Sequence, residues 1–195
     1  MNNIAVLIDP AGYRQTPWKN GGGVTVDIAG AFREDARAGR WDDMIWRFGW
    51  TTIAKPAPFS DLSGFDRMQV VVRGHGLVLR TPDADIDVRR AFEPVRFKGS
   101  TPINSQLENG PVDVVNLMGD SRLTKIDLRV LQSGATLALT PGIHVLYAAN
   151  EICAVAVATG GHKIATDWAL RLDLTTTETL HAKSGRLIVG SVFLQ

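Results

Sequence analysis

The stretch Pro17-Trp18-Lys19-Asn20-Gly21-Gly22-Gly23 places an aromatic ring, a cation and an amide beside three glycines. Lys19 can neutralise an anion, and Asn20 can both donate and accept hydrogen bonds. Glycine allows positive φ angles and close approach of other groups. These residue types favour binding of a small anion. The same composition is typical of an ordinary surface turn, so the stretch alone leaves both interpretations open.

The three glycines could also indicate a phosphate-binding loop. Such a loop needs a strand before the glycines and a helix after them, so that backbone N–H groups face the phosphate. Here Val24-Thr25-Val26-Asp27-Ile28 follows, which is β-branched and strand-like, and the GK[ST] order is absent. The sequence therefore argues against a phosphate loop.

Two further cations, Arg47 and Arg67, lie in aromatic or glycine-rich surroundings. A buried guanidinium needs a carboxylate or phosphate partner, which either the protein or a ligand supplies. Several cations around one cavity would favour a bound carboxylate, because it matches the planar guanidinium fork. Internal partners are the alternative, and the acidic candidates for Arg47 are Asp27, Asp43 and Asp66.

No catalytic or metal-binding set is evident. The four histidines, His75, His144, His162 and His181, are far apart, and no H-x-H pair occurs. No G-x-S-x-G elbow surrounds a serine. The single cysteine, Cys153, lies in an apolar run and fits a small buried hydrophobe. We therefore expect no catalytic residue, no metal and no cofactor.

Composition indicates an ordinary folded protein of 195 residues, with 45% hydrophobic and 21% charged residues. The formal net charge of +1 gives no electrostatic footprint for nucleic acid or an anionic membrane. One cysteine permits no intrachain disulfide, which favours a reducing compartment. No signal peptide or long apolar run is visible. We therefore expect a cytoplasmic protein.

Short β-branched segments separated by turn residues run through nearly the whole chain. We count about fourteen expected strands, at the spacing typical of sandwiches and barrels. Residues 4–8 predict a strand and residues 32–38 a short helix. Residues 67–72 and 76–80 predict the two strands of a hairpin, and residues 99–110 predict a loop.

That loop predicts a boundary between two barrel-like halves, residues 1–110 and 111–195, with strands exchanged between them. Closing an antiparallel sheet removes its edge strands and creates an inward-facing cavity. Rigid strands can hold polar side chains inside such a cavity, and there we expect the ligand site.

The order of motifs resembles that of the HutD/Ves family over about residues 5–195. The Pro17–Gly23 stretch resembles the family hallmark. The segments that follow in the family's order are Trp46-Arg47, Pro58-Phe59-Ser60, Gly64-Phe65-Asp66-Arg67, Gly74-His75-Gly76-Leu77-Val78-Leu79, Pro94-Val95-Arg96-Phe97-Lys98-Gly99 and Asp113-Val114-Val115-Asn116-Leu117-Met118.

The resemblance implies an all-β bicupin: two antiparallel β-barrel or jelly-roll halves, very little helix, and none of the usual cupin metal ligands. It implies a non-enzymatic regulator of histidine utilisation that binds a small carboxylate such as formylglutamate or urocanate. Enzymatic activity is not established for the family. A metal-independent isomerase or lyase acting on a small organic acid, a Ves-like stress protein, and a homodimeric interaction module remain alternatives.

On this basis the expected ligand-binding residues are Lys19, Asn20, Trp18, Arg47, Phe59, Ser60, Arg67 and Asn116. Lys19 would neutralise one carboxylate, and Arg47 or Arg67 a second. Asn20 and Ser60 would direct hydrogen bonds, and the two aromatic residues would form an apolar wall. Asn116 could instead cap a turn. The expected partner is a small carboxylate, with neither nucleic acid nor membrane.

Overall fold

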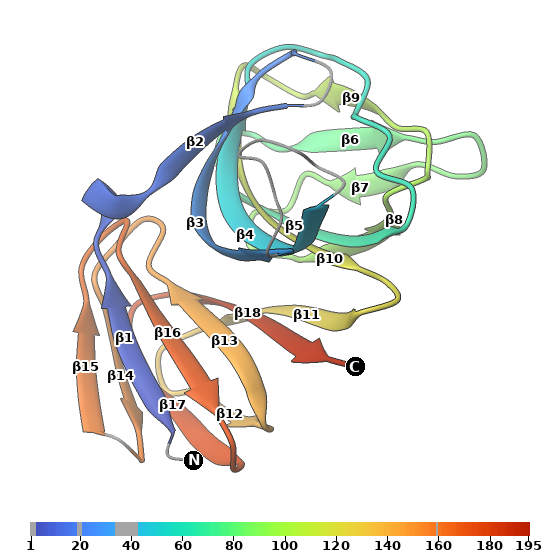
Figure 1. Ribbon diagram of the computed structural model, residues 1–195. Helices are drawn as coiled ribbons and strands as arrows, with labels where there is room; N and C mark the ends of the chain where they lie inside the picture. The colour runs from blue at the N-terminus through green and yellow to red at the C-terminus, as the bar shows by residue number, and fades with distance from the viewer. Residues whose placement is uncertain (1–2, 19–20, 34–42, 159) are drawn as a thin grey trace. The chain divides into compact units, whose positions relative to one another are not determined.

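The computed structural model describes residues 3–18, 21–33, 43–158 and 160–195. These residues form eighteen β-strands and one short 3-10 helix, Pro10–Gly12. The prediction of an almost entirely β protein is confirmed. The chain divides into two compact units (Figure 1). Unit 1 comprises Met1–Tyr13 and Lys125–Gln195, and unit 2 comprises Arg14–Thr124.

Unit 2 contains two antiparallel sheets. Six strands pair in the order β2-β3-β4-β10-β5-β8, and three in the order β7-β6-β9. Their bounds are β2 (Arg14–Pro17), β3 (Val24–Phe32), β4 (Met44–Ile53), β5 (Phe65–Arg73), β6 (Leu77–Arg80), β7 (Ile86–Val88), β8 (Val95–Lys98), β9 (Asn104–Leu107) and β10 (Val112–Asp120).

The core of unit 2 lies between these two sheets. Val71 and Val114 contribute from the larger sheet, and Leu77 and Leu79 from the smaller one. All four are fully buried. Because alternate residues of a strand share one face, the same face of β5 and β10 continues from these valines to Gln69 and Asn116. The inner face therefore changes from apolar to polar along the strands.

Unit 1 is also built from two antiparallel sheets, in the orders β1-β16-β13-β18-β11 and β12-β17-β14-β15. One apolar cluster takes residues from both sheets. The strands are β1 (Ile4–Ile8), β11 (Thr124–Leu131), β12 (Thr136–Leu139), β13 (Gly142–Tyr147), β14 (Cys153–Val157), β15 (Gly160–Ile164), β16 (Ala169–Leu174), β17 (Glu178–Ser184) and β18 (Leu187–Leu194).

The division differs from the boundary expected between residues 110 and 111. That point falls inside unit 2, directly before β10, which pairs with both β4 and β5. The N-terminal strand β1 belongs to unit 1, where it pairs with β16. Residues 99–110 were expected to form a loop, but they include strand β9. The sequence did not indicate this strand, because Asn104-Ser105-Gln106-Leu107 is mostly polar and carries no β-branched residue.

The expected hairpin over residues 67–80 is wrong. Strand β5 pairs with β8 and β10, whereas β6 pairs with β7 and β9, so the turn leads from one sheet to the other. Gly74 and Gly76 both have positive φ. A Cβ on Gly76 would lie 2.4 Å from the Arg89 Cα, and one on Gly74 would lie 2.5 Å from the Pro111 carbonyl oxygen. These glycines therefore permit a crowded crossing between sheets.

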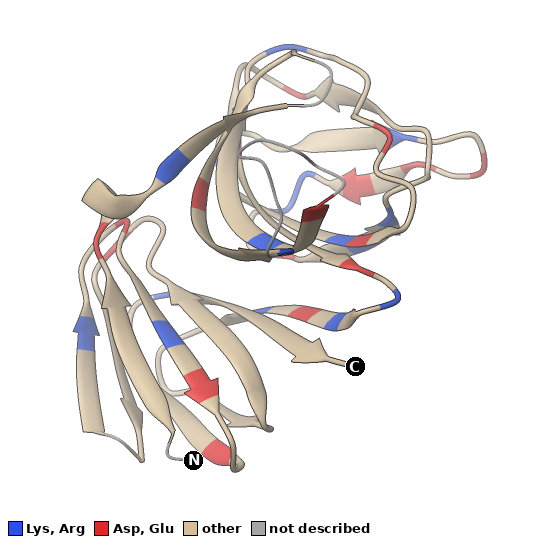
Figure 2. Cartoon of the chain, viewed as in Figure 1, with Lys and Arg blue, Asp and Glu red and all other residues tan. Residues whose placement is uncertain are grey.

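A helix was expected over residues 32–38. Its first residue, Phe32, is instead the last residue of strand β3. Residues 34–38 lie outside the described part of the chain. Within the described residues there is no helix with the length and hydropathy needed to span a membrane. Acidic and basic residues are interspersed along the strands in the view of Figure 2.

Candidate functional site

A small pocket, partly open to solvent, lies within unit 2. Its walls are mainly apolar, with a few polar groups among them, as is usual for small-molecule sites. Five of the eight expected site residues line it: Trp18, Phe59, Ser60, Arg67 and Asn116. Sequence reasoning missed other lining residues, including Thr25, Thr51, Gln69 and Met118.

Strand register brings the polar wall together. Arg67 and Gln69 are two residues apart on β5, so they share one face. On the adjacent strand β10, Met118 lies opposite Arg67, and Asn116 lies opposite Gln69. Directly opposite residues of an antiparallel pair project to the same side, so these four side chains form one patch.

Arg67 is the cation of this patch. It is 7% exposed, and its guanidinium carbon lies 5.1 Å from the centre of the Phe59 ring and 5.0 Å from that of Phe97. Such contacts stabilise a cation through the negative ring faces. No carboxylate of the described residues forms an ion pair with Arg67, and its Nε has no hydrogen-bond partner among them. Burial lowers the pKa of Arg67 to about 10, so it remains cationic at neutral pH.

Two amides complete the patch. Gln69 is 1% exposed and Asn116 is 4% exposed. Within the described part of the chain, both amide atoms of Gln69 and the Oδ1 of Asn116 lack hydrogen-bond partners. Buried polar groups are nearly always satisfied in native proteins, so three such side chains around one cavity are unusual. Together they present a cation, hydrogen-bond donors and hydrogen-bond acceptors to whatever occupies the cavity.

The tryptophan of the glycine-rich stretch is held by a tight turn. The backbone N–H of Trp18 donates to the Gly23 carbonyl at 2.8 Å, and its indole Nε1 donates to Thr25 Oγ1 at 3.1 Å. A Cβ on Gly23 would lie 3.0 Å from the Trp18 ring, so any larger residue would require the indole to shift. The turn thereby fixes the indole at the cavity wall.

Three of the expected residues are not placed at the cavity. Lys19 and Asn20 lie outside the described residues. Arg47 is not among the residues lining the cavity, and it forms an ion pair with Asp27 on the neighbouring strand. Thr16 donates a second hydrogen bond to Asp27, at 2.6 Å. For Arg47 the internal partner is therefore the correct alternative.

The histidines do not assemble a metal site in the described part of the chain, where no three His, Cys, Asp or Glu side chains are grouped to hold an ion. His144, in unit 1, contacts the Ser191 hydroxyl through Nδ1 and the Thr140 carbonyl through Nε2, each at 2.9 Å. Because the Thr140 carbonyl can only accept, Nε2 carries the proton in this arrangement. Burial lowers the pKa of His144, which favours a neutral structural imidazole.

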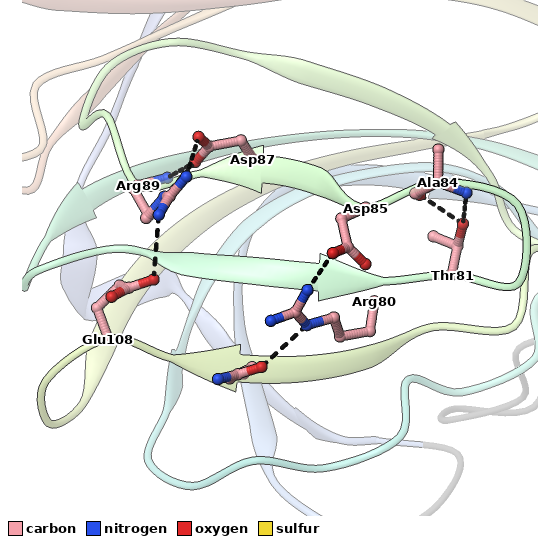
Figure 3. A network of polar contacts seen from close by, with 8 residues as sticks. Arg80, Thr81, Ala84, Asp85, Asp87, Arg89 and Glu108 are labelled. Atoms are coloured by element: carbon pink, nitrogen blue, oxygen red, sulfur yellow. Dashed lines mark hydrogen bonds and ion pairs between the residues drawn. The ribbon is translucent and has the colours of Figure 1, made fainter.

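The basic residues near β7 have acidic partners. On and beside β6, β7 and β9, Arg80 pairs with Asp85, and Arg89 pairs with Asp87 and Glu108 (Figure 3). Arg80 also donates to Gln106 at 2.9 Å. These side chains are about half exposed, where such pairs contribute little to stability. Their mutual pairing distinguishes them from buried Arg67.

One signal in the sequence could have identified Gln69. The alternation of Arg67, Gln69 and Val71 predicts one strand face that turns from polar to apolar, and a glutamine there would be flanked by buried residues. The neighbouring strand could not be identified in this way. Strand β10 lies about 45 residues further along the chain, and only the fold shows that it pairs with β5.

Comparisons with known proteins agree with this architecture. An uncharacterized 21.2 kDa protein in the hutC 3′ region of Pseudomonas putida is 26% identical over 152 residues, which cover 78% of this chain and 77% of that protein. A solved protein of unknown function from Pseudomonas aeruginosa PAO1 has 24% identity and a TM-score of 0.81, covering 98% of this chain and 99% of that one.

The structure of HutD from Pseudomonas fluorescens SBW25, in a formate condition, has 21% identity and a TM-score of 0.78, covering 98% of this chain and 100% of that one. More distant cupin-like structures, at 7–10% identity and TM-scores of 0.56–0.66, show the fold alone. The HutD family model matches residues 11–189. Because this match includes nearly the whole chain, the protein belongs to the HutD family.

Proposed function

We propose that this protein is a small-molecule-binding regulator of histidine utilisation, and that its ligand is a small carboxylate held in the unit 2 cavity. Formylglutamate and urocanate, both intermediates of that pathway, are the candidate ligands. Membership of the HutD family and the relative in the hutC 3′ region support the link to the pathway.

One observation carries the carboxylate assignment: Arg67 is a buried cation at a cavity, with no acidic partner among the described residues. A buried charge is stable only when an opposite charge or hydrogen bonds compensate for its lost hydration. The two phenylalanine rings provide part of this compensation, and a carboxylate would provide the remainder through paired N–H···O bonds.

The other residues have roles consistent with this ligand. Trp18 and Phe59 form an apolar wall, and Ser60 offers a hydroxyl. Lys19 directly follows Trp18 in sequence and keeps its proposed role as a second cation, with Asn20 as a hydrogen-bonding neighbour. Arg47 is left out of the ligand set because Asp27 neutralises it.

A thermal-shift and calorimetric titration tests the proposal. Formylglutamate or urocanate at roughly 1–10 mM should raise the unfolding midpoint, because a ligand that binds only the folded state stabilises it by mass action. Arg67→Met should abolish the rise. The matched control is Arg90→Met, since the Arg90 side chain is 81% exposed and forms its ion pair with the exposed surface residue Glu93.

Two further results complete the test. Lys19→Ala should weaken binding if Lys19 contacts the ligand. Proton NMR of the same mixtures over hours should show the acids unchanged, whereas Arg67-dependent conversion would indicate an enzyme instead. If neither acid binds the wild-type protein, or if Arg67→Met binds as well as Arg90→Met, the proposed site is wrong.

A further inference from the structure

Gln69 and Asn116 lie side by side at the cavity without bonding to each other. They occupy opposite register positions on β5 and β10, where side chains are in contact range. Both line the cavity, and both are more than nine-tenths buried. Nevertheless, Gln69 Nε2, Gln69 Oε1 and Asn116 Oδ1 have no partner among the described residues.

These open hydrogen-bonding groups destabilise the unliganded fold. Burial removes the water that an amide would otherwise bind, and an unsatisfied amide loses that interaction without replacement. An apolar side chain at position 69 would continue the buried face of Val71 and Val114. Amides at these positions are explained if a ligand provides the missing partners.

We propose that Gln69 and Asn116 determine ligand specificity. They bind a neutral polar group that both donates and accepts hydrogen bonds, such as an amide, on the same small acid whose carboxylate contacts Arg67. This inference rests on the proposed carboxylate site. Gln69 presents one donor and one acceptor whichever way its amide is turned, and Asn116 adds an amide of the same kind.

The pair should reject two other kinds of group. A second carboxylate only accepts hydrogen bonds, so it would lie against the amide oxygens without satisfying them, and its charge would be buried without a cation. A methyl group would leave all the amide atoms unpaired. Specificity then follows from the groups that the wrong ligand leaves unsatisfied as much as from those that the right ligand binds.

Strand geometry sets the length of the ligand. Residues i and i+2 of a strand are separated by roughly 7 Å, because each residue advances the chain by about 3.4 Å. Arg67 and Gln69 have this relation on β5. A carboxylate and a neutral polar group joined by a short chain of a few atoms can therefore contact both residues at once.

Three acids of similar length test this inference on the full chain. Glutaramate carries a carboxylate and a primary amide, glutarate carries two carboxylates, and pentanoate ends in a methyl group. Isothermal titration calorimetry should show glutaramate binding roughly 10-fold or more tightly than either of the others. In Arg67→Met, the affinity for all three acids should fall.

The substitution Gln69→Met separates a specificity role from a structural one, because methionine has a similar shape without polar amide atoms. Glutaramate should lose its advantage of roughly 10-fold, while the affinity for pentanoate stays unchanged. The midpoint of the unliganded protein should rise, since a buried unsatisfied group is removed. Gln106→Met is the matched control, because Gln106 is exposed on β9 of the same unit.

The outcomes separate this inference from the proposed function. Equal, Arg67-dependent binding of the three acids overturns the specificity role and leaves the carboxylate site intact. Equal binding is also the result expected if fixed water molecules, and not a ligand, satisfy the Gln69 and Asn116 amides. A lower midpoint in unliganded Gln69→Met with unchanged selectivity overturns it as well. If none of the acids and neither pathway intermediate binds, the carboxylate site fails and the specificity role fails with it.

Discussion

Arg47 on β4 and Arg67 on β5 occupy equivalent positions in the larger sheet of unit 2. The two strands flank β10, and both arginines lie opposite Met118 of that strand. Their surroundings nevertheless differ. Arg47 is ion-paired with Asp27, whereas Arg67 contacts two phenylalanine rings and lines the cavity. The residue type was readable from the sequence, but the partner was not, because the partners come from other strands.

This difference predicts opposite effects of one substitution. Arg47→Met should lower the free energy of unfolding by about 3 kcal/mol, because it leaves the partly buried Asp27 carboxylate without its cation. Arg67→Met should change it by less than about 1 kcal/mol, since an unpaired buried charge is replaced by an apolar side chain. Urea unfolding followed by tryptophan fluorescence measures both, and equal losses would make Arg67 a structural residue.

Among the elements, β4, β10 and β5 determine the site, because their register aligns Asn116 with Gly49 on one side and Gln69 on the other. The alternation within each strand was predictable from the sequence. The pairing was not, since β10 enters between two strands that precede it in the chain. Strand pairing depends on side-chain packing over long sequence separations, which local patterns do not encode.

Gly49 offers a test of this arrangement. A Cβ at this position would lie 2.4 Å from the Val26 carbonyl oxygen and 3.1 Å from Thr25 Cγ2. Gly49→Ala must therefore displace β3 from β4 and move Thr25, which lines the cavity. We expect a loss of about 1–3 kcal/mol in the free energy of unfolding, together with weaker carboxylate binding.

The matched control is Gly161→Ala on strand β15, where the nearest atom to an added Cβ is 3.9 Å away. Urea unfolding and calorimetric titration of both variants make the comparison. If Gly49→Ala behaves like Gly161→Ala, the close approach of β3 and β4 does not constrain the site.

At the scale of the molecule, the two units differ in whether they are formed by one continuous segment of the chain. Unit 2 is one uninterrupted segment with its own two sheets and apolar core, whereas unit 1 is assembled from both ends of the chain. The β-branched segments allowed the all-β class to be predicted. They did not reveal this division, because β1 resembles any other short apolar strand and its partner β16 is far along the sequence.

We therefore expect a fragment of residues 14–124 to fold alone and to bind carboxylates, because its core is formed within the segment. The fragment of residues 125–195 lacks β1, so the edge of β16 that normally pairs with it would be left open. That fragment should be poorly folded or aggregated. Circular dichroism and NMR dispersion test both, and a disordered 14–124 fragment would contradict the expectation.

Unit 1 is built from two segments that are far apart in the sequence, and this has a consequence for synthesis of the chain. Strand β1 leaves the ribosome long before its partner β16 (Ala169–Leu174), which only two further strands follow in the chain. At 5–20 residues per second, the interval is roughly 10–30 s. During this time unit 2 can fold, while the apolar segment Ile4–Ile8 waits unpaired. Until β16 has been translated, β1 is thus open to premature association and to binding by holdase chaperones.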